Sequence, residues 1–326
     1  MQQRFRLLNL LADGRFHSGQ ELGVALGISR GAVWKHLKAL SVLDIDIHAV
    51  PGRGYQLAQP IELLSEERIL GLIDENSKNR IAGLEIFHEI KSTNSYLMHK
   101  ASPGYRSAHI CLAESQQEGR GRHGQRWVSP YARNIYLSIL WDFPMGPDSL
   151  VGLGLAVGVG VMRALHESGI AQAGLKWPND VIWNGAKLAG ILLEMTGISS
   201  SNCRVVAGVG LNVNMPARSS GLIDRPWTDM NTILKKEISR NSVCACLIHH
   251  LLEVLIQFEK NGLSPFLKEW RRYDVVAGKK VTLQLPGSEV SGVSHGIDDN
   301  GALLIEGNNT MRRFYSGEIS RVHVAY

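Results

Sequence analysis

Gly119-Arg120-Gly121-Arg122-His123-Gly124-Gln125-Arg126-Trp127 places three glycines, three arginines and a histidine within nine residues. Glycines and closely spaced cations suit neither a buried strand nor a helix interior, and no acidic residue lies between Glu118 and Asp142. Strand-like runs at residues 110–113 and 135–139 flank the stretch. We therefore predict a mobile loop that a rigid scaffold presents to an anion. The alternative is an ordinary exposed basic loop.

The glycines of this loop also match G-x-G-x-x-G, the dinucleotide-binding fingerprint. That fingerprint requires a helix directly after the glycines, because the helix N-terminus receives the pyrophosphate. Here Pro130 and a run with period-two alternation follow instead. A Rossmann fold is therefore rejected, and the arginines carry the functional signal of the loop.

Composition indicates a multidomain protein of a reducing compartment. The chain has 326 residues, and 44% of them are hydrophobic, which is enough for two or three domains with sizeable cores. The four cysteines form no C-x-x-C pair, so free buried thiols are expected. No targeting segment is evident. Residues 150–162 are apolar but look too short to span a bilayer, which favours a buried helix and a cytoplasmic protein with no membrane partner.

The first 60 residues have the pattern of a DNA-binding module. They hold seven Lys and Arg against four Asp and Glu. Ser18 and Glu21 form a capping box for one helix, a turn follows at Gly27, and Ser29 can cap a third helix. Residues 45–50 and 55–57 then read as a hairpin, the wing of a winged helix-turn-helix. A plain helical hairpin is the alternative.

The third helix presents its inward face through Val33 and Leu37, one helical turn apart. Its other side chains are predicted to contact DNA bases or phosphates, together with the arginine at the tip of the wing. Trp34 has a second interpretation, since it can pack beneath the wing instead. The predicted DNA-binding residues are Ser29, Arg30, Trp34, Lys35, Lys38 and Arg53.

Short clusters of polar and cationic residues lie between predicted strands and helices in the middle of the chain. Residues 92–95 are three hydroxyl residues and an amide at a predicted strand-to-helix junction, where they cap the helix and can also bind a polar ligand. Residues 176–180 place a lysine, an asparagine and an aspartate around one proline turn. Asn184-Gly185 predicts a two-residue hairpin, and Lys187 opens the apolar return strand.

The last 54 residues alternate as short strands at 280–285, 289–296, 302–305 and 311–315, which predicts a small β-barrel. Before them, a predicted helix at residues 241–259 carries His249 and His250. We recognise no acidic or cysteine partner of these histidines at metal-ligand spacing. Both are therefore expected to be solvated or hydrogen-bonded, and no resident metal site is predicted.

Three motifs occur in one order, namely residues 119–127, Lys176-Trp-Pro-Asn-Asp180 and Lys187-Leu-Ala-Gly-Ile-Leu192. Together they resemble biotin protein ligases, and with the helix-turn-helix in front the whole chain resembles the bacterial bifunctional ligase and biotin operon repressor. The resemblance implies an α+β multidomain fold. Its parts would be a winged helix-turn-helix over residues 1–62, a catalytic mixed-sheet domain like that of class II aminoacyl-tRNA synthetases over 63–272, and an SH3-like domain over 273–326.

The resemblance also implies the chemistry. Biotin and ATP, with Mg²⁺, would form biotinyl-5′-AMP, and a lysine of the biotin carboxyl carrier protein of acetyl-CoA carboxylase would take the biotin. The adenylate would also act as corepressor, favouring a homodimer on operator DNA of biotin biosynthesis genes. Two alternatives are a repressor that senses a ligand without turnover and a lipoate or octanoate transferase. The cationic residues Arg120, Arg122, Lys176 and Lys187 argue against the first alternative. The motifs at residues 119–127 and 176–180 favour biotin over the second.

Site residues follow from the same resemblance. Catalysis would rest on Arg122, Lys187 and Lys176. Gln125 departs from the common family pattern, in which arginine is usual. Biotin would contact Ser92, Thr93, Asn94, Gln116, Arg120, Gly121, Arg122 and Lys187, and the nucleotide would contact Trp127, Asn179, Asp180, Gly208 and Asn212.

Overall fold

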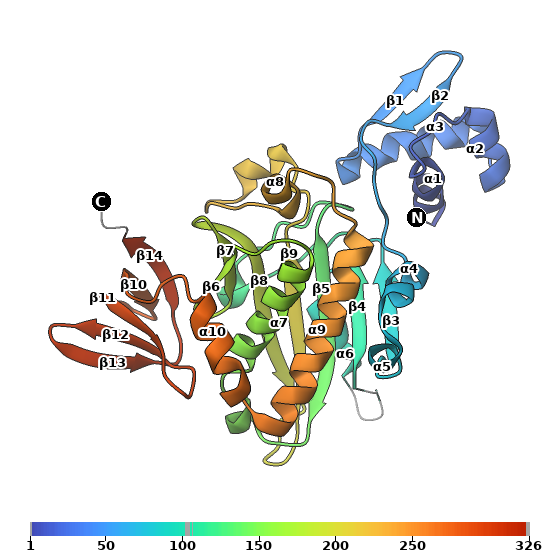
Figure 1. The fold of residues 1–326 in the computed structure, drawn as a ribbon. Coiled ribbons are helices and arrows are strands. Elements are labelled where there is room, and N and C mark those ends of the chain that lie inside the picture. Colours follow the sequence, from blue (N-terminus) through green and yellow to red (C-terminus); the bar gives the residue numbers. More distant parts are fainter. Residues whose placement is uncertain (1, 102–104, 106, 324–326) are drawn as a thin grey trace.

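The computed structural model describes residues 2–101, 105 and 107–323. Its N-terminal region contains α1 (Gln2–Leu11), α2 (Gly19–Leu26) and α3 (Arg30–Ala39), followed by the hairpin of β1 (Ile47–Val50) and β2 (Gly54–Leu57) (Figure 1). Ser18 forms the predicted capping box with Glu21, and Ser29 caps α3 by accepting a hydrogen bond from Ala32 N. The winged helix-turn-helix is confirmed.

A seven-stranded mixed sheet forms the centre of the molecule, in the order β3-β4-β5-β9-β8-β7-β6. Only β3 and β4 pair in parallel among its described neighbours, and the others pair antiparallel. Asn184 and Gly185 both have positive φ and join β7 to β8, as predicted. The strands are β3 (Gly83–Phe87), β4 (His109–Ala113), β5 (Ile135–Phe143), β6 (Gly174–Lys176), β7 (Asp180–Trp183), β8 (Ala186–Thr196) and β9 (Cys203–Leu211).

The two faces of the sheet carry different helices. The long helices α7 (Leu153–Glu167) and α9 (Arg240–Asn261) pack on one face, where Ile110 and Ile139 belong to the main core (Figure 1). On the other face Leu97 of α6 (Thr93–Lys100) packs on Cys111 and Leu140. The split follows from the period of two along a strand, which sends neighbouring side chains to opposite faces.

Residues 150–162 belong to a longer helical segment that extends from Pro147 to Glu167. This segment and α9 are long and apolar enough for a membrane span by length and composition, but 67% and 61% of their most apolar windows are buried in protein. They are apolar because they form the core. The interpretation of residues 150–162 as part of a buried helix is therefore confirmed.

One expectation fails on α9. Glu253 lies three and four residues after His250 and His249, and its carboxylate is close to both rings. Side chains at this spacing share one face of a helix. The two histidines therefore do have an acidic partner at metal-ligand spacing. The remaining α-helices described are α4 (Glu66–Leu72), α5 (Glu75–Lys78), α8 (Met230–Leu234) and α10 (Leu267–Tyr273).

The C-terminal region is a five-stranded antiparallel sheet in the order β13-β12-β11-β10-β14. Its last strand, β14, was not predicted. Apolar residues of this sheet, including Val281 and Leu303, belong to the same hydrophobic core as the central sheet. The strands are β10 (Lys280–Leu285), β11 (Ser288–Ile297), β12 (Leu303–Gly307), β13 (Thr310–Phe314) and β14 (Glu318–His323).

The N-terminal region also packs against the central region. Tyr131 and Ala132 follow the glycine-arginine loop in sequence, yet they are buried in the hydrophobic core of the helix-turn-helix. Phe5 of α1 stacks on His88 with ring centroids 4.2 Å apart, and His88 Nδ1 lies 2.7 Å from the Tyr131 hydroxyl. Arg4 forms an ion pair with Glu89 beside this stack.

Candidate active site

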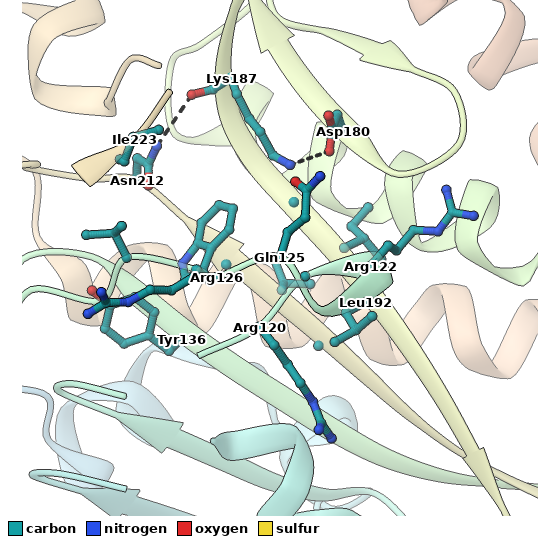
Figure 2. A pocket seen from close by; sticks show the side chains of 18 of the residues that line it. Arg120, Arg122, Gln125, Arg126, Tyr136, Asp180, Lys187, Leu192, Asn212 and Ile223 are labelled. Carbon is teal, nitrogen blue, oxygen red and sulfur yellow. Dashed lines mark hydrogen bonds and ion pairs between the residues drawn. The ribbon is translucent and has the colours of Figure 1, made fainter. Parts of the chain in front are cut away.

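A cavity of ≈ 440 Å³ lies above β8 and β9, beneath the loop of residues 119–127 (Figure 2). A segment at residues 222–227 and Glu318 of β14 complete its lining. The structure brings almost all of the predicted ligand-binding residues together here. Those that line the cavity are Ser92, Thr93, Asn94, Gln116, Arg120, Gly121, Arg122, Trp127, Asn179, Asp180, Lys187, Gly208 and Asn212.

Hydroxyl and amide groups form one end of the cavity. Ser92 caps α6, as the structural interpretation of this residue predicted. Thr93 donates through its backbone N–H to Gln116 Oε1 at 2.9 Å, and Ser138 Oγ donates to Asn94 Oδ1 at 2.6 Å. The Asn94 amide in turn donates to Glu194 at 3.0 Å. These groups fix one another in place and offer a pre-organised polar surface.

The glycine-arginine loop folds back on itself around a short 3-10 turn at Arg122–Gly124, and an isolated β-bridge joins Arg120 to Arg126. Gly121 N donates to Gln125 O at 2.7 Å, and Trp127 N donates to Gly119 O at 2.8 Å. A Cβ at Gly119 would crowd Trp127 O, whereas a Cβ at Gly121 would meet nothing nearer than 3.7 Å. Gly121 thus leaves open space at the cavity, where a ligand can approach the backbone.

Trp127 covers the floor of the cavity. Its indole lies over Gly190 of β8 and Gly210 of β9, where a Cβ on either glycine would crowd the ring. Its Nε1 is buried without a hydrogen-bond partner, and Lys187 Nζ lies 5.5 Å from its ring centroid. A flat aromatic with an unused donor is well placed to pack against another planar ring.

Opposite charges meet at the start of β8. Lys187 Nζ lies 2.5 Å from Asp180 Oδ1 (Figure 2). Lys176 Nζ lies 3.8 Å from Asp180 Oδ2. Burial lowers the pKa of Lys176, while the Asp180 carboxylate opposes this effect. Lys176 does not line the cavity. Its ammonium instead donates to Ile319 O at 3.1 Å. Lys176 therefore contacts Asp180 from outside the cavity.

The loop arginines already have partners in this structure. Arg120 forms an ion pair with Glu194 at 2.8 Å, and Arg122 donates to the carbonyl of Gly317 at 3.0 Å. Burial lowers the pKa of the Arg122 guanidinium. Arg122 therefore connects the loop to the C-terminal sheet as well as facing the cavity.

Several residues of the site were not predicted from the sequence. Ser138 and Glu194 lie in the middle of strands, and Glu318 pairs with Arg225 from distant parts of the chain. Single polar residues within strands form no motif. Side chains along a strand point alternately to the two faces of the sheet, and Ser138 and Glu194 fall on the face that carries α6. This position in the alternation is the only sequence signal for them. Gly208 lines the cavity and also lets Asn94 approach the backbone closely, since a Cβ there would overlap Asn94 Oδ1.

The predicted DNA-binding residues lie on one part of the helix-turn-helix. Trp34 is 52% exposed, with Lys38 Nζ 4.7 Å from its ring centroid. Packing of Trp34 beneath the wing is therefore ruled out. Arg53 at the wing tip stacks on Phe16 at 4.3 Å. The side chains of Ser29, Arg30, Lys35, Lys38 and Arg53 are all on exposed residues.

Comparison with known proteins matches all three regions. Residues 86–212 match the Biotin/lipoate A/B protein ligase family, residues 3–56 an HTH domain and residues 276–322 the Biotin protein ligase C terminal domain. The chain is 39% identical over 315 residues to the bifunctional ligase/repressor BirA of Escherichia coli, covering 97% of this chain and 96% of that protein.

The chain belongs to the family of bifunctional biotin ligase/repressors. It is also 31% identical over 260 residues to a biotin--[acetyl-CoA-carboxylase] ligase of Mycobacterium tuberculosis, covering 75% of this chain and 94% of that protein. A solved biotin protein ligase of Aquifex aeolicus, in complex with biotin and ATP, superposes with a TM-score of 0.63 at 27% identity. It covers 74% of this chain and all of that one. This biotin ligase is therefore an enzyme with an N-terminal DNA-binding domain.

Proposed function

We propose that the protein joins biotin to ATP to form biotinyl-5′-AMP and pyrophosphate. It then transfers biotin to a lysine of the biotin carboxyl carrier protein of acetyl-CoA carboxylase, with release of AMP. The observation that carries this proposal is the cavity itself. It places a pre-organised polar end, formed by Thr93, Asn94 and Gln116, on the same floor as the Lys187–Asp180 pair. A long ligand with a polar head and an anionic tail fits this distribution of groups.

The first step brings two anions together, the biotin carboxylate and the α-phosphate. In the free enzyme Lys187 is held by Asp180. A bound phosphate would take over this ammonium, and Arg122 would supply a second cation from above. Fixed cations lower the barrier because they meet the charge that develops in the transition state. Asn212 Oδ1 is buried without a partner and can accept a hydrogen bond from the adenine.

Mg²⁺ is expected to enter with ATP, since oxygen ligands from phosphates usually dominate its coordination. Asp180 is the protein carboxylate that we propose to hold it, because this side chain is buried at the floor and is released when Lys187 turns to the phosphate. The ion would neutralise charge on the leaving pyrophosphate.

The second step uses a mixed anhydride that water would hydrolyse. The loop of residues 119–127 lies over the cavity and is tethered at Arg120 and Arg122. A loop in this position can exclude water until the acceptor lysine enters. We assign the same loop a regulatory role, in which the adenylate favours a homodimer that binds a palindromic operator of biotin biosynthesis genes. The protein would act in the cytoplasm.

One assay separates this proposal from its alternatives. Pyrophosphate exchange into ATP is expected with biotin and Mg²⁺, and not with lipoate or octanoate. Exchange with lipoate alone would favour a lipoate ligase, and ligand binding without any exchange would favour a sensor. Sedimentation with and without biotinyl-5′-AMP tests the regulatory part, which is abandoned if the dimer affinity is unchanged.

A further inference from the structure

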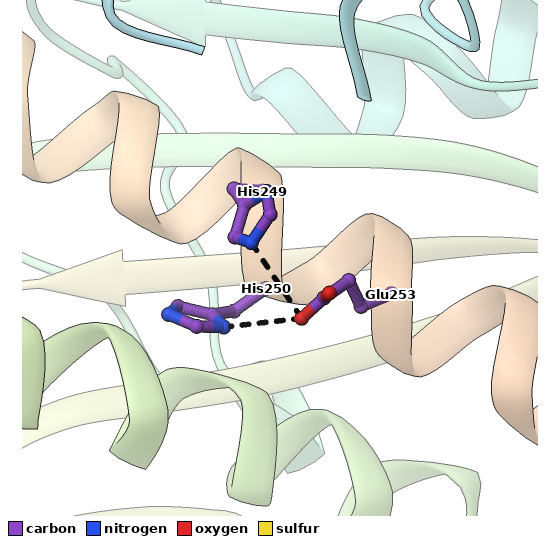
Figure 3. Close-up of side chains that lie close together, drawn as sticks. All are labelled: His249, His250 and Glu253. Atoms are coloured by element: carbon purple, nitrogen blue, oxygen red, sulfur yellow. Dashed lines mark ion pairs between the residues drawn. The ribbon is translucent and has the colours of Figure 1, made fainter. Parts of the chain in front are cut away.

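We propose that His249, His250 and Glu253 of α9 form a binding site for one divalent transition metal ion, with zinc as the best match. Figure 3 shows both imidazole rings directed at the same carboxylate oxygen of Glu253. His249 Nε2 lies 3.6 Å from Glu253 Oε2, and His250 Nδ1 lies 3.4 Å from it. All three ligand atoms lie within 4.8 Å of one another.

Outer carboxylates fix which nitrogen of each ring points inward. His249 Nδ1 lies 2.8 Å from Asp74 Oδ2, and His250 Nε2 lies 2.9 Å from Glu167 Oε2. A carboxylate only accepts hydrogen bonds here, so the tautomers with the proton on these nitrogens satisfy both contacts. The Ser77 hydroxyl, 3.0 Å from His249 Nδ1, can accept from the same proton. In a neutral imidazole the other nitrogen then bears a lone pair. This arrangement of carboxylate, histidine and open nitrogen is the usual second shell of a metal site.

With both rings neutral, the open nitrogens face an anionic acceptor instead of a donor. His250 Nδ1 is buried and makes no hydrogen bond in the described structure, although Glu253 faces it. In the neutral tautomers two lone pairs point at an anionic oxygen, which is unfavourable in a partly buried place. A divalent ion between the three atoms reverses the sign of this interaction, since it accepts all three lone pairs.

The donor set selects the class of metal. Two imidazoles and one carboxylate suit zinc, whereas Mg²⁺ and Ca²⁺ prefer oxygen ligands alone. Bonds of about 2.0–2.1 Å place tetrahedral ligands about 3.3 Å apart, so the two nitrogen-to-oxygen separations need little change. Glu253 is half exposed and can admit the ion, while water would fill the fourth position.

The site is separate from ligase chemistry. None of its residues lines the active-site cavity. Asp74 caps α5 and Glu167 ends α7, so a metal held on α9 would connect three helices through these outer carboxylates. The expected consequence is a more stable helical layer, not a change in the reaction.

The test uses the untagged full-length chain, stripped of metal and titrated with Zn²⁺ against a competing chelator. One ion per chain is expected to bind in the wild type. His250→Ala is expected to abolish this binding, and Glu253→Gln to weaken it at least about tenfold. Asp74→Asn, which keeps an N-cap acceptor for α5, and Glu167→Gln are each expected to weaken it about 10- to 100-fold.

Two control variants address other zinc-binding groups. Cys246→Ser removes a partly exposed thiol beside Glu167, and His295→Ala removes a surface histidine that pairs with one carboxylate, Glu306. Both are expected to keep wild-type zinc affinity. Biotinylation activity of every variant, measured with excess Mg²⁺ and a zinc-selective chelator, reports that it is folded. Absence of zinc binding in the wild type, unchanged affinity in His250→Ala, or loss of binding in Cys246→Ser would each overturn the proposal.

Discussion

Lys187 is the cation of the cavity that lies nearest to the buried carboxylate of Asp180. Lys187→Ala removes the ammonium that we expect to meet the phosphate, so biotin-dependent exchange of pyrophosphate into ATP should fall by at least about 10²-fold. Lys91→Ala is the matched control, because this exposed lysine pairs with Glu118 outside the cavity. Near-normal exchange in Lys187→Ala would contradict the assigned role.

We expect Arg122 to act after the adenylate has formed, by retaining it in the cavity. Arg122→Gly removes the hydrogen bond to Gly317 O and the cation above the ligand. Loss of a charge-assisted hydrogen bond of about 1.5–3 kcal/mol should speed adenylate dissociation about 10- to 100-fold. The released anhydride would then label lysines of bystander proteins. Retention of the adenylate as in the wild type, measured by dissociation of radiolabelled adenylate, would refute this.

At the scale of elements, β9 and α6 are in direct contact through a glycine. Gly208→Ala would drive a methyl group into Asn94 Oδ1, and such overpacking costs about 1–3 kcal/mol. The result should be a biotin dissociation constant raised about tenfold, measured by calorimetry. Gly71→Ala in α4 is the control, since a Cβ there meets nothing within 4 Å. Equal biotin affinity in both variants would contradict the prediction that crowding of Asn94 weakens biotin binding.

The start of α9 is fixed by a buried ion pair. Arg240 donates to Glu114 Oε2 at 2.7 Å and to Asn134 O, and both charged groups are almost fully buried. Glu114→Gln leaves the guanidinium without a charged partner, so the free energy of unfolding should fall by about 3–5 kcal/mol in urea. Asp299→Asn breaks the exposed pair with Arg271 and should cost less than about 1 kcal/mol. Similar losses of unfolding free energy in the two variants would mean that burial does not determine how much each ion pair contributes to stability.

Local signals predicted the elements well, because their causes lie within a few residues. The Ser18 capping box and the Asn184-Gly185 hairpin both form as expected. The cavity was predicted only where motifs mark it. Glu318 reaches the site through packing of the C-terminal sheet, and no local pattern encodes such a contact. Lys176 was expected to face the ligand because it lies in a motif, but its ammonium donates to Ile319 O of the C-terminal sheet instead. That contact also depends on packing between distant parts of the chain.

At the scale of the whole molecule, the predicted DNA-binding residues are exposed and lie outside the active-site cavity. Lys35→Ala removes one expected phosphate contact, so operator affinity should fall and the slope of log affinity against log salt should decrease by about 1. Ligase activity should not change. Lys268→Ala, on the exposed side of α10, is the matched control. An unchanged salt slope in Lys35→Ala would place this lysine outside the interface.

Tyr131 and Ala132, which come shortly after the loop of residues 119–127, complete the core of the helix-turn-helix. The catalytic and DNA-binding parts of this chain are therefore not interchangeable modules joined at a linker. A helix-turn-helix grafted from a relative would have to accept the Tyr131 ring beside its own first helix, where Phe5 and His88 now stack. Substitutions in the core of the helix-turn-helix are therefore constrained by a segment of the catalytic region, so the two regions are expected to change in sequence together.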